Sequence, residues 1–135
     1  MYSKYVFSGH ESFSCRMLWP IKGYDYINDG NSFNDPNSVI MLGVGKNMVA
    51  SIRYWLKALG LTEHDKPSTL AKYLFDEAQG KDRYLESLGT LWLLHFLLVV
   101  LNEATLYNIL FLRYQKERKQ FAKEQVLNFV KRLMA

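Results

Sequence analysis

The residues with the clearest chemistry in this chain fall on one predicted helix, from Lys46 to Leu59. Placed at about 100° per residue, its apolar residues gather on one arc and its polar residues on the opposite arc. Cations bind phosphate, and Asn or Ser side chains hydrogen bond to base edges in the major groove. The polar arc therefore predicts contacts to duplex DNA, through Lys46, Arg53 and Lys57 on one edge and through Asn47, Ser51 and Tyr54 on the other.

A second interpretation of the same helix stays open. Any amphipathic helix on the surface of a slightly basic protein carries Lys and Arg on its solvent side. The pattern of residues 46–59 therefore favours DNA binding over a merely solvated helix face without excluding the latter.

The residues around this helix predict a helix-turn-helix. Asp35 can cap a short preceding helix, and Pro36 suits the first helical position, where its missing N–H costs nothing. Gly43 and Gly45 supply the turn, and Gly60 ends the second helix. These glycines lack the spacing of a nucleotide-hydrolysing loop, so we expect no nucleotide chemistry.

Two other groups of polar residues are candidates for catalysis on DNA. His10 and Glu11 lie together, but Glu11 fits a helix cap with Ser8, and the second histidine of a metalloprotease motif is absent. The loop at residues 82–86 contains two acids and a tyrosine, which could serve strand cleavage. The histidines and the single cysteine form no close pair, so we expect no metal site and no cofactor.

Length and composition predict one domain with a hydrophobic core. The chain has 135 residues, of which 49% are apolar and 15% are aromatic. Cys15 has no partner for an internal disulfide and no signal sequence is recognisable, so we expect a cytoplasmic protein. The apolar run at residues 91–101 is too short to cross a bilayer. We expect it to form a helix buried on nearly all sides, with no membrane partner.

The formal net charge of +4 is unevenly distributed. Residues 113–135 contain seven Lys or Arg residues and two acidic residues. Such a segment attracts polyanions, although it is more often a solvated helix face. Arg118 and Lys119 are the predicted outlying contacts to phosphate.

The order of local signals predicts a mainly α fold with little β structure. Helices are expected at residues 9–18, 36–42, 46–59, 68–78, 102–115 and 123–134 and from residue 88 onward, with a short strand at residues 61–63. Pro20 interrupts the first helix, so residues 20–27 form either a separate helical turn or a kinked continuation. We expect a helix-turn-helix or winged-helix-like core in residues 1–67 and a helical half in residues 68–135 of a single domain.

Several motifs along the chain resemble a bacterial family known as domain of unknown function number four thousand and seven. They lie in order at residues 7–13, 15–25, 42–49, 51–57, 84–86 and 89–95. The resemblance implies a protein encoded beside genes for DNA phosphorothioate modification and phage defence. Family members are thought to act on DNA, with nicking as one suggested activity. They usually continue further, so the chain looks like their N-terminal part.

The sequence thus favours a DNA-binding module of a bacterial phosphorothioate modification or restriction system that holds duplex DNA through residues 46–59. Other subunits of a modification or defence complex are expected partners. One alternative is a protein–protein interaction module of the same system, and another is a DNA nickase. We expect no catalysis by this chain alone.

Overall fold

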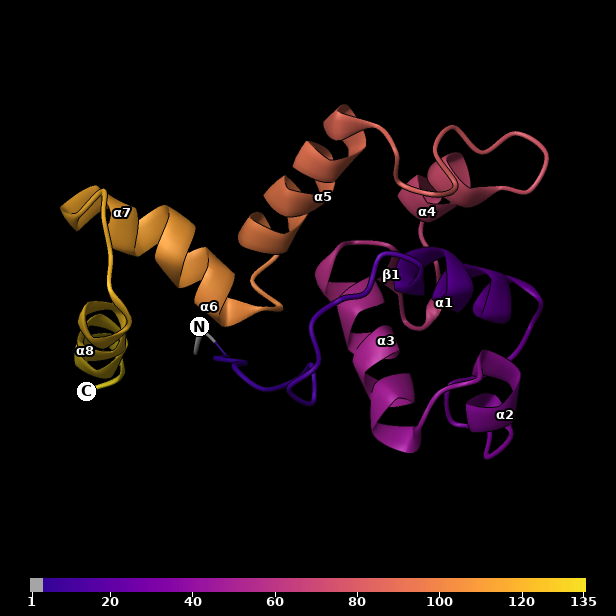
Figure 1. Cartoon of the computed structure of the whole chain (residues 1–135), viewed down its shortest axis with the longest axis horizontal. Coiled ribbons are helices and arrows are strands. Elements are labelled where there is room, and N and C mark those ends of the chain that lie inside the picture. The colour runs from indigo at the N-terminus through magenta and orange to yellow at the C-terminus, as the bar shows by residue number, and fades with distance from the viewer. Residues whose placement is uncertain (1–3) are drawn as a thin grey trace.

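The computed structural model describes residues 4–135 and confirms a mainly α fold (Figure 1). The helices are α1 (Trp19–Asn28), α2 (Ser38–Leu42), α3 (Lys46–Ala58), α4 (Thr69–Phe75), α5 (Leu88–Val100), α6 (Thr105–Asn108), α7 (Gln115–Glu117) and α8 (Lys123–Met134). A π-helical stretch, η1 (Ile109–Tyr114), connects α6 to α7. The strands β1 (Thr62–Glu63) and β2 (Lys66–Pro67) form an antiparallel hairpin.

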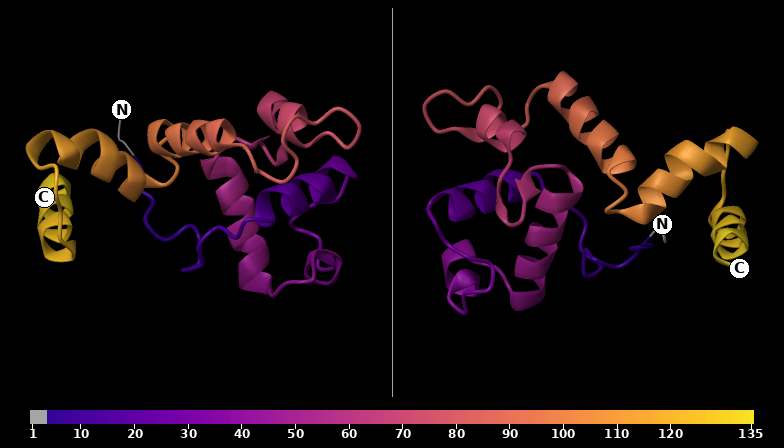
Figure 2. Two further views of the ribbon diagram at one scale, coloured as in Figure 1. Left: turned by 45° about the horizontal axis from the view of Figure 1, so that its top comes forward. Right: turned by 180° about the vertical axis from the view of Figure 1, so that it is seen from behind.

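The elements divide into a compact group and a C-terminal arm. Helices α1 to α4 and the hairpin lie together, whereas α6, η1, α7 and α8 extend toward the opposite end of the molecule (Figures 1 and 2). Helix α5 crosses between them and contacts α6. The main core contains residues between Trp19 and Ala104, and a separate small cluster of Ile109, Tyr114 and Phe129 holds the arm together.

Helices α1 and α3 pack closely at the centre of the compact group. Ile52 and Leu56 on the inner face of α3 are fully buried, and both lie against Gly23 of α1. A Cβ atom at Gly23 would lie 2.5 Å from Leu56 Cδ1 and 2.9 Å from Ile52 Cγ2. The absence of a side chain at Gly23 therefore permits the contact that orients α3.

The predicted pair of helices joined by a glycine turn is present. The Asp35 carboxylate accepts a hydrogen bond from the Asn37 amide at 2.8 Å, just before α2 begins. Gly43 ends α2 with a φ of 66°, which is the left-handed conformation that glycine adopts at low cost. Helix α3 then begins at Lys46, as expected.

The hairpin after α3 contains the second strand that the sequence did not reveal. Thr62 pairs with Pro67, and Glu63 pairs with Lys66. The two residues between the strands, His64 and Asp65, have φ values of 50° and 60°, as a tight hairpin turn of type I′ requires.

A serine caps the next helix, as predicted. The Ser68 hydroxyl accepts a hydrogen bond from the Ala71 amide at 3.1 Å, at the start of α4. The helix is shorter than expected, since it ends at Phe75 rather than near residue 78.

The prediction of a helix at residues 9–18 is wrong. Glu11 and Ser12 have φ values of 51° and 64°, which an α-helix does not contain. The expected cap is replaced by a backbone turn, in which the Glu11 amide donates to the Ser8 carbonyl at 3.2 Å. The segment runs beside α3, and its carbonyl groups accept hydrogen bonds from α3 side chains. These tertiary contacts replace the backbone bonds of a helix, and Pro20 lies in the first turn of α1.

Helix α5 begins at Leu88 as predicted, but the expectation that it is buried on nearly all sides is wrong. Leu94 and Leu98 are buried in the main core, whereas Trp92 and Phe96 are more than half exposed. The apolar run faces the core on one side only, because the following chain turns away into the arm (Figure 1).

The arm also differs in detail from its prediction. The single helix expected at residues 102–115 begins three residues later and contains the π-helical stretch. In α8, Phe129 is the buried residue, whereas Leu127 is about half exposed.

Within residues 4–135, no single helix has the length and apolar composition needed to cross a membrane. Helix α5 and residues 105–117 meet the length and composition criteria only as a pair, bent by 96°.

We expect Gly23→Ala to lower the free energy of unfolding by about 1–3 kcal/mol, because the added methyl group would overlap Leu56 and Ile52. Gly45→Ala, just before α3, is the matched control, since nothing lies within 4 Å of its added methyl group and its φ of −70° suits alanine. It should change the free energy of unfolding by less than about 1 kcal/mol. Denaturant unfolding followed by circular dichroism measures both, and equal effects would contradict the close contact between α1 and α3.

Candidate nucleic-acid interface

Three cations lie in one line along the outer side of α3. Lys46, Arg53 and Lys57 fall within a narrow arc at about 100° per residue, and Ala50 occupies the same line. Arg53 is partly exposed, and the other three residues are exposed. We call these four positions the α3 stripe. The small side chain of Ala50 leaves the middle of the stripe open to a flat or convex ligand.

The C-terminal part of the α3 stripe lines an open groove of about 910 Å³. The hairpin contributes His64 and Asp65 to the lining, and the end of α5 with its following loop contributes Leu101 and Glu103. Lys46 does not line the groove and lies at the N-terminal end of α3. The groove therefore borders the stripe on the side of Arg53 and Lys57 and leaves Lys46 free of it.

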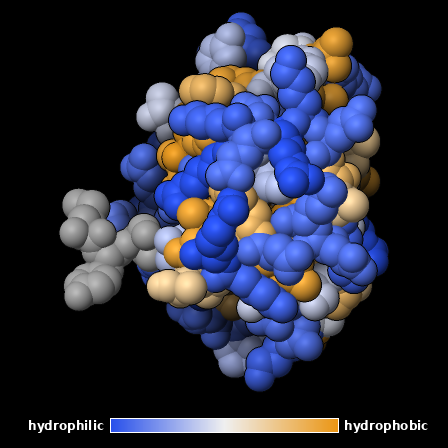
Figure 3. Space-filling model, turned by 90° about the vertical axis from the view of Figure 1, so that its left-hand side faces the viewer, coloured by the Kyte–Doolittle hydropathy of each residue, from blue (hydrophilic) through white to orange (hydrophobic). Residues whose placement is uncertain are grey.

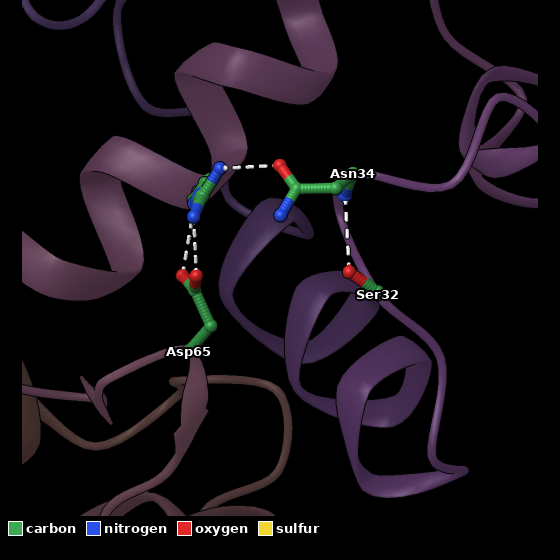
Figure 4. Close-up of polar contacts among 4 residues, drawn as sticks. Ser32, Asn34 and Asp65 are labelled. Carbon is green, nitrogen blue, oxygen red and sulfur yellow. Dashed lines mark hydrogen bonds and ion pairs between the residues drawn. The ribbon is translucent and has the colours of Figure 1, made fainter.

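Arg53 is held by two partners from different elements (Figure 4). Its guanidinium donates to both carboxylate oxygens of Asp65, from Nε at 2.9 Å and from Nη2. Its Nη1 donates to the Asn34 side-chain oxygen at 3.1 Å, and the backbone N–H of Asn34 donates to the Ser32 hydroxyl at 3.2 Å. Arg53 and Asp65 each have 41% of their side chains exposed, and pairs of this kind contribute at most about 1 kcal/mol. The pair can therefore open at low cost.

The other two cations differ in their pairing. Lys57 Nζ lies 3.2 Å from a carboxylate oxygen of Glu103 in the loop after α5. Lys46 makes no ion pair with any residue in 4–135. Carboxylates thus balance the charges of Arg53 and Lys57, whereas the charge of Lys46 is not balanced by any residue in 4–135.

The prediction that Ser51 contacts DNA is wrong in this structure. Ser51 is fully buried, and its hydroxyl donates to the His10 carbonyl at 2.8 Å. The N-terminal segment lies over this edge of α3, a long-range contact that helix periodicity does not encode. Ser51 therefore anchors the segment to α3 and has no face open to a ligand.

The same segment partly covers Tyr54. Its ring lies against Gly9 and packs on His10 and Trp55 at centroid distances of 6.0 and 5.3 Å. Its hydroxyl donates to the Glu103 carbonyl at 3.4 Å. Tyr54 nevertheless reaches the groove, so it borders the α3 stripe as a half-buried side chain.

Asn47 is exposed and adjoins Lys46 in the first turn of α3. On the edge of α3 that was predicted to contact bases, Asn47 is thus exposed to solvent, whereas Ser51 is buried.

The predicted outlying contacts, Arg118 and Lys119, lie far from the α3 stripe. Both are exposed and follow α7 directly, in the connection to α8. Helices α7 and α8 form the end of the molecule opposite α2 in Figures 1 and 2, and hydrophilic side chains cover most of this end in Figure 3. The structure therefore does not bring Arg118 and Lys119 together with the cations of α3.

The residues proposed for strand cleavage have structural contacts. His10 Nδ1 accepts a hydrogen bond from the Ser12 amide at 3.3 Å. The Asp82 carboxylate accepts from the amides of Glu86 and Ser87 at 2.8 and 3.0 Å, just before α5. Desolvation acts to raise the pKa of Asp82, but hydrogen bonds from the Thr90 side chain and these two amides outweigh it and lower the pKa. In the described chain, no group of three or more His, Cys, Asp or Glu side chains could hold a metal ion.

Sequence reasoning missed the carboxylates that face the α3 stripe. Asp65 lies 12 residues after Arg53, and Glu103 lies 46 residues after Lys57. For the first pairing, a hairpin turn at His64 and Asp65 only pairs β2 with β1, and the packing of β1 against α3 then brings Asp65 beside Arg53. The second has no local signal.

The chain matches a family model over nearly its whole length. The model is described as "Protein of unknown function (DUF4007)" and covers residues 7–135. No curated protein matches the chain.

Two solved structures are similar to this chain. One, titled "SspB crystal structure", has 40% sequence identity and a TM-score of 0.63 over 68% of this chain. The other, titled "Magnesium ion-bound SspB crystal structure", has 39% identity and a TM-score of 0.62 over 69% of this chain. The match spans only 31% and 30% of those proteins, respectively.

The environment of Tyr54 predicts its behaviour in alkaline solution. Burial, followed by the nearby Tyr107 and Glu103, raises the pKa of Tyr54 from 10.0 to about 12. Between pH 10 and pH 12, Tyr54 ionises in the unfolded chain but stays neutral in the folded chain. The free energy of unfolding therefore falls as the pH rises from about 10 to 12. Tyrosinate absorbance of the protein minus that of Tyr54→Phe should therefore titrate with a midpoint near 12. A midpoint near 10.0 would mean that the N-terminal segment does not cover the ring.

Proposed function

The chain belongs to the DUF4007 family, and from that premise we propose that it is a DNA-binding module of a bacterial phosphorothioate modification or restriction system used in phage defence. The module holds duplex DNA through the outer side of α3. The observation that carries this proposal is the α3 stripe, in which Lys46, Arg53 and Lys57 lie in one line with Ala50 between them.

The spacing of the stripe suits a nucleic-acid backbone. Lys46 and Lys57 are 11 residues apart, which corresponds to about 16 Å along a helix. DNA presents one negative charge per roughly 1.7 Å of its axis, so cations spread over this length meet several phosphates. The stripe therefore favours a polyanion over a small anionic ligand, which would need the cations to converge on one point.

The N-terminal end of α3 is the proposed point of first contact. Lys46 has no carboxylate partner in residues 4–135, and Asn47 beside it is exposed. Gly45 precedes the helix in an extended conformation without a side-chain cap, so the first amides of α3 can also donate to phosphate. We propose that α2, the turn and α3 act as a helix-turn-helix with α3 as the recognition helix.

Arg53 and Lys57 join the contact by exchanging a carboxylate for a phosphate. Asp65 and Glu103 hold the two cations beside the groove, and both pairs are substantially exposed. Exposed ion pairs are weak, so a phosphate can replace either carboxylate without a large loss of folding free energy. The two acids then act against DNA by repulsion, which keeps the affinity moderate.

The family and its structural neighbours support the proposal of a phosphorothioate modification or restriction system. The family resemblance implies genes for DNA phosphorothioation, and the two similar structures are both SspB proteins. The chain spans about 30% of their length, so nicking and the contacts with other subunits of the complex remain proposals for longer family members.

We expect Lys46→Ala with Arg53→Ala to weaken binding to random duplex DNA. The change should also reduce the slope of log K against log salt by about two units, since two phosphate contacts are lost. Fluorescence anisotropy at several salt concentrations measures both quantities. Lys123→Ala with Lys131→Ala in α8 removes the same charge at the far end of the molecule and is the matched control. The assignment of DNA binding to α3 would be contradicted if the α3 variant left the salt slope unchanged. It would also be contradicted if the control variant reduced the slope by the same amount.

We expect Asp65→Asn to strengthen DNA binding by roughly 3- to 10-fold at low salt, because it frees Arg53 and removes a repelling charge. Asn tolerates the positive φ at this position, so the turn should be kept. Glu124→Gln, which removes one exposed acid from α8, should change the affinity much less. A loss of affinity in Asp65→Asn would show that Arg53 must be held by Asp65 to contact DNA.

A further inference from the structure

Helix α5 exposes an apolar surface that the other elements within residues 4–135 leave largely uncovered. Four residues share one side of the helix and have 40–64% of their area exposed: Trp92 64%, Leu93 41%, Phe96 59% and Val100 40%. Gly89 lies on the same side, and nothing but Ser87 Oγ, at 3.7 Å, approaches the position of its missing side chain. We call these five residues the α5 surface. No charged residue occurs between Leu88 and Leu101.

The α5 surface is at the upper end of the apolar patches that monomeric proteins expose. Its exposed apolar side chains present on the order of 500 Å², and patches of this size often mark interaction sites. The whole chain exposes 9209 Å², whereas a compact monomer of 15.8 kDa would expose roughly 7,300 Å². The α5 surface can provide the apolar centre of an interface in which each partner buries roughly 800 Å², including a polar rim.

Four of the five residues of the α5 surface, all but Trp92, have a spacing that is the same when read in either direction. Gly89, Leu93, Phe96 and Val100 are separated by four, three and four residues. An antiparallel pair of identical helices places Gly89 opposite Val100 of the second copy and Leu93 opposite its Phe96. A two-fold interface requires this self-matching, because each residue must meet its counterpart in both directions.

The side chains also complement one another in size. The open space above Gly89 can receive Val100 of a second copy, so the two helix ends approach closely. Gaps of three and four residues are those of helices packed side by side at a small crossing angle. Antiparallel packing also places the opposite ends of the two helix dipoles together.

We propose that the α5 surface is a dimerisation site, on which a second copy of this chain packs its own α5 in antiparallel orientation. The proposal is independent of the proposed function, since the α5 surface contains none of the cations of α3. Dimerisation through α5 could be observed even if the chain did not bind DNA, and a monomer could still bind DNA.

Sedimentation equilibrium at protein concentrations between micromolar and several hundred micromolar tests the oligomeric state of the chain. The expected mass approaches twice 15.8 kDa at high concentration. Phe96→Glu should hold the mass at that of one chain, with the helical circular dichroism signal kept. Ile40→Glu in α2 changes an apolar residue with 80% exposure outside the α5 surface and should dimerise normally. A wild-type mass of one chain at every concentration would assign the α5 surface to another occupant and overturn the proposal.

A disulfide trap tests the orientation without relying on a charged substitution. In a Cys15→Ser background, Gly89→Cys with Val100→Cys should form a covalent dimer on mild oxidation, because the two positions meet across the proposed two-fold axis. Each single variant is the matched control, since its cysteine would lie about 16 Å along the helix from its equivalent in the second copy. Cross-linking of the single variants as fast as the double variant would rule out this antiparallel register.

Discussion

The contact between Gly23 of α1 and the inner face of α3 fixes the arrangement on which the rest depends. Ile52 and Leu56 are buried against this glycine, so α3 cannot rotate about its axis without opening the core. A second constraint comes from the N-terminal segment, whose carbonyl groups accept hydrogen bonds from Ser51 and Trp55 at 2.8 and 2.9 Å. Two sides of α3 are thereby fixed, and the α3 stripe is the side that stays open.

Two of the three cations on the outer side of α3, Arg53 and Lys57, form ion pairs with acids of other elements. Asp65 reaches Arg53 from the hairpin, and Glu103 reaches Lys57 from the loop after α5. Both acids are contributed by elements that also line the groove, so the groove determines how strongly the cations are neutralised. Because such pairs are weak and screened by salt, they leave Arg53 and Lys57 available to other anions and contribute little to the stability of the fold.

The sequence predicted features that depend on neighbours in the chain. The Asp35 and Ser68 hydrogen bonds, the left-handed Gly43 and the start of α3 at Lys46 all involve residues within a few positions of one another. The errors came from contacts between distant segments. The periodicity of α3 correctly separated apolar from polar positions, but it could not reveal that residue 10 would cover Ser51.

The apolar run of α5 shows a different limit of sequence reasoning. A run of leucines indicates that apolar surface must be buried, but it does not say whether the same chain or another one buries it. Leu97 and Leu101 on one side of α5 lie over Gly60 at the end of α3 and line the groove. The α5 surface lies on the same rigid helix. A partner packed there would consequently fix the groove wall with respect to the α3 stripe. In a two-fold pair it would also set the spacing between two such stripes, which is the quantity that determines half-site separation when paired helices read one duplex.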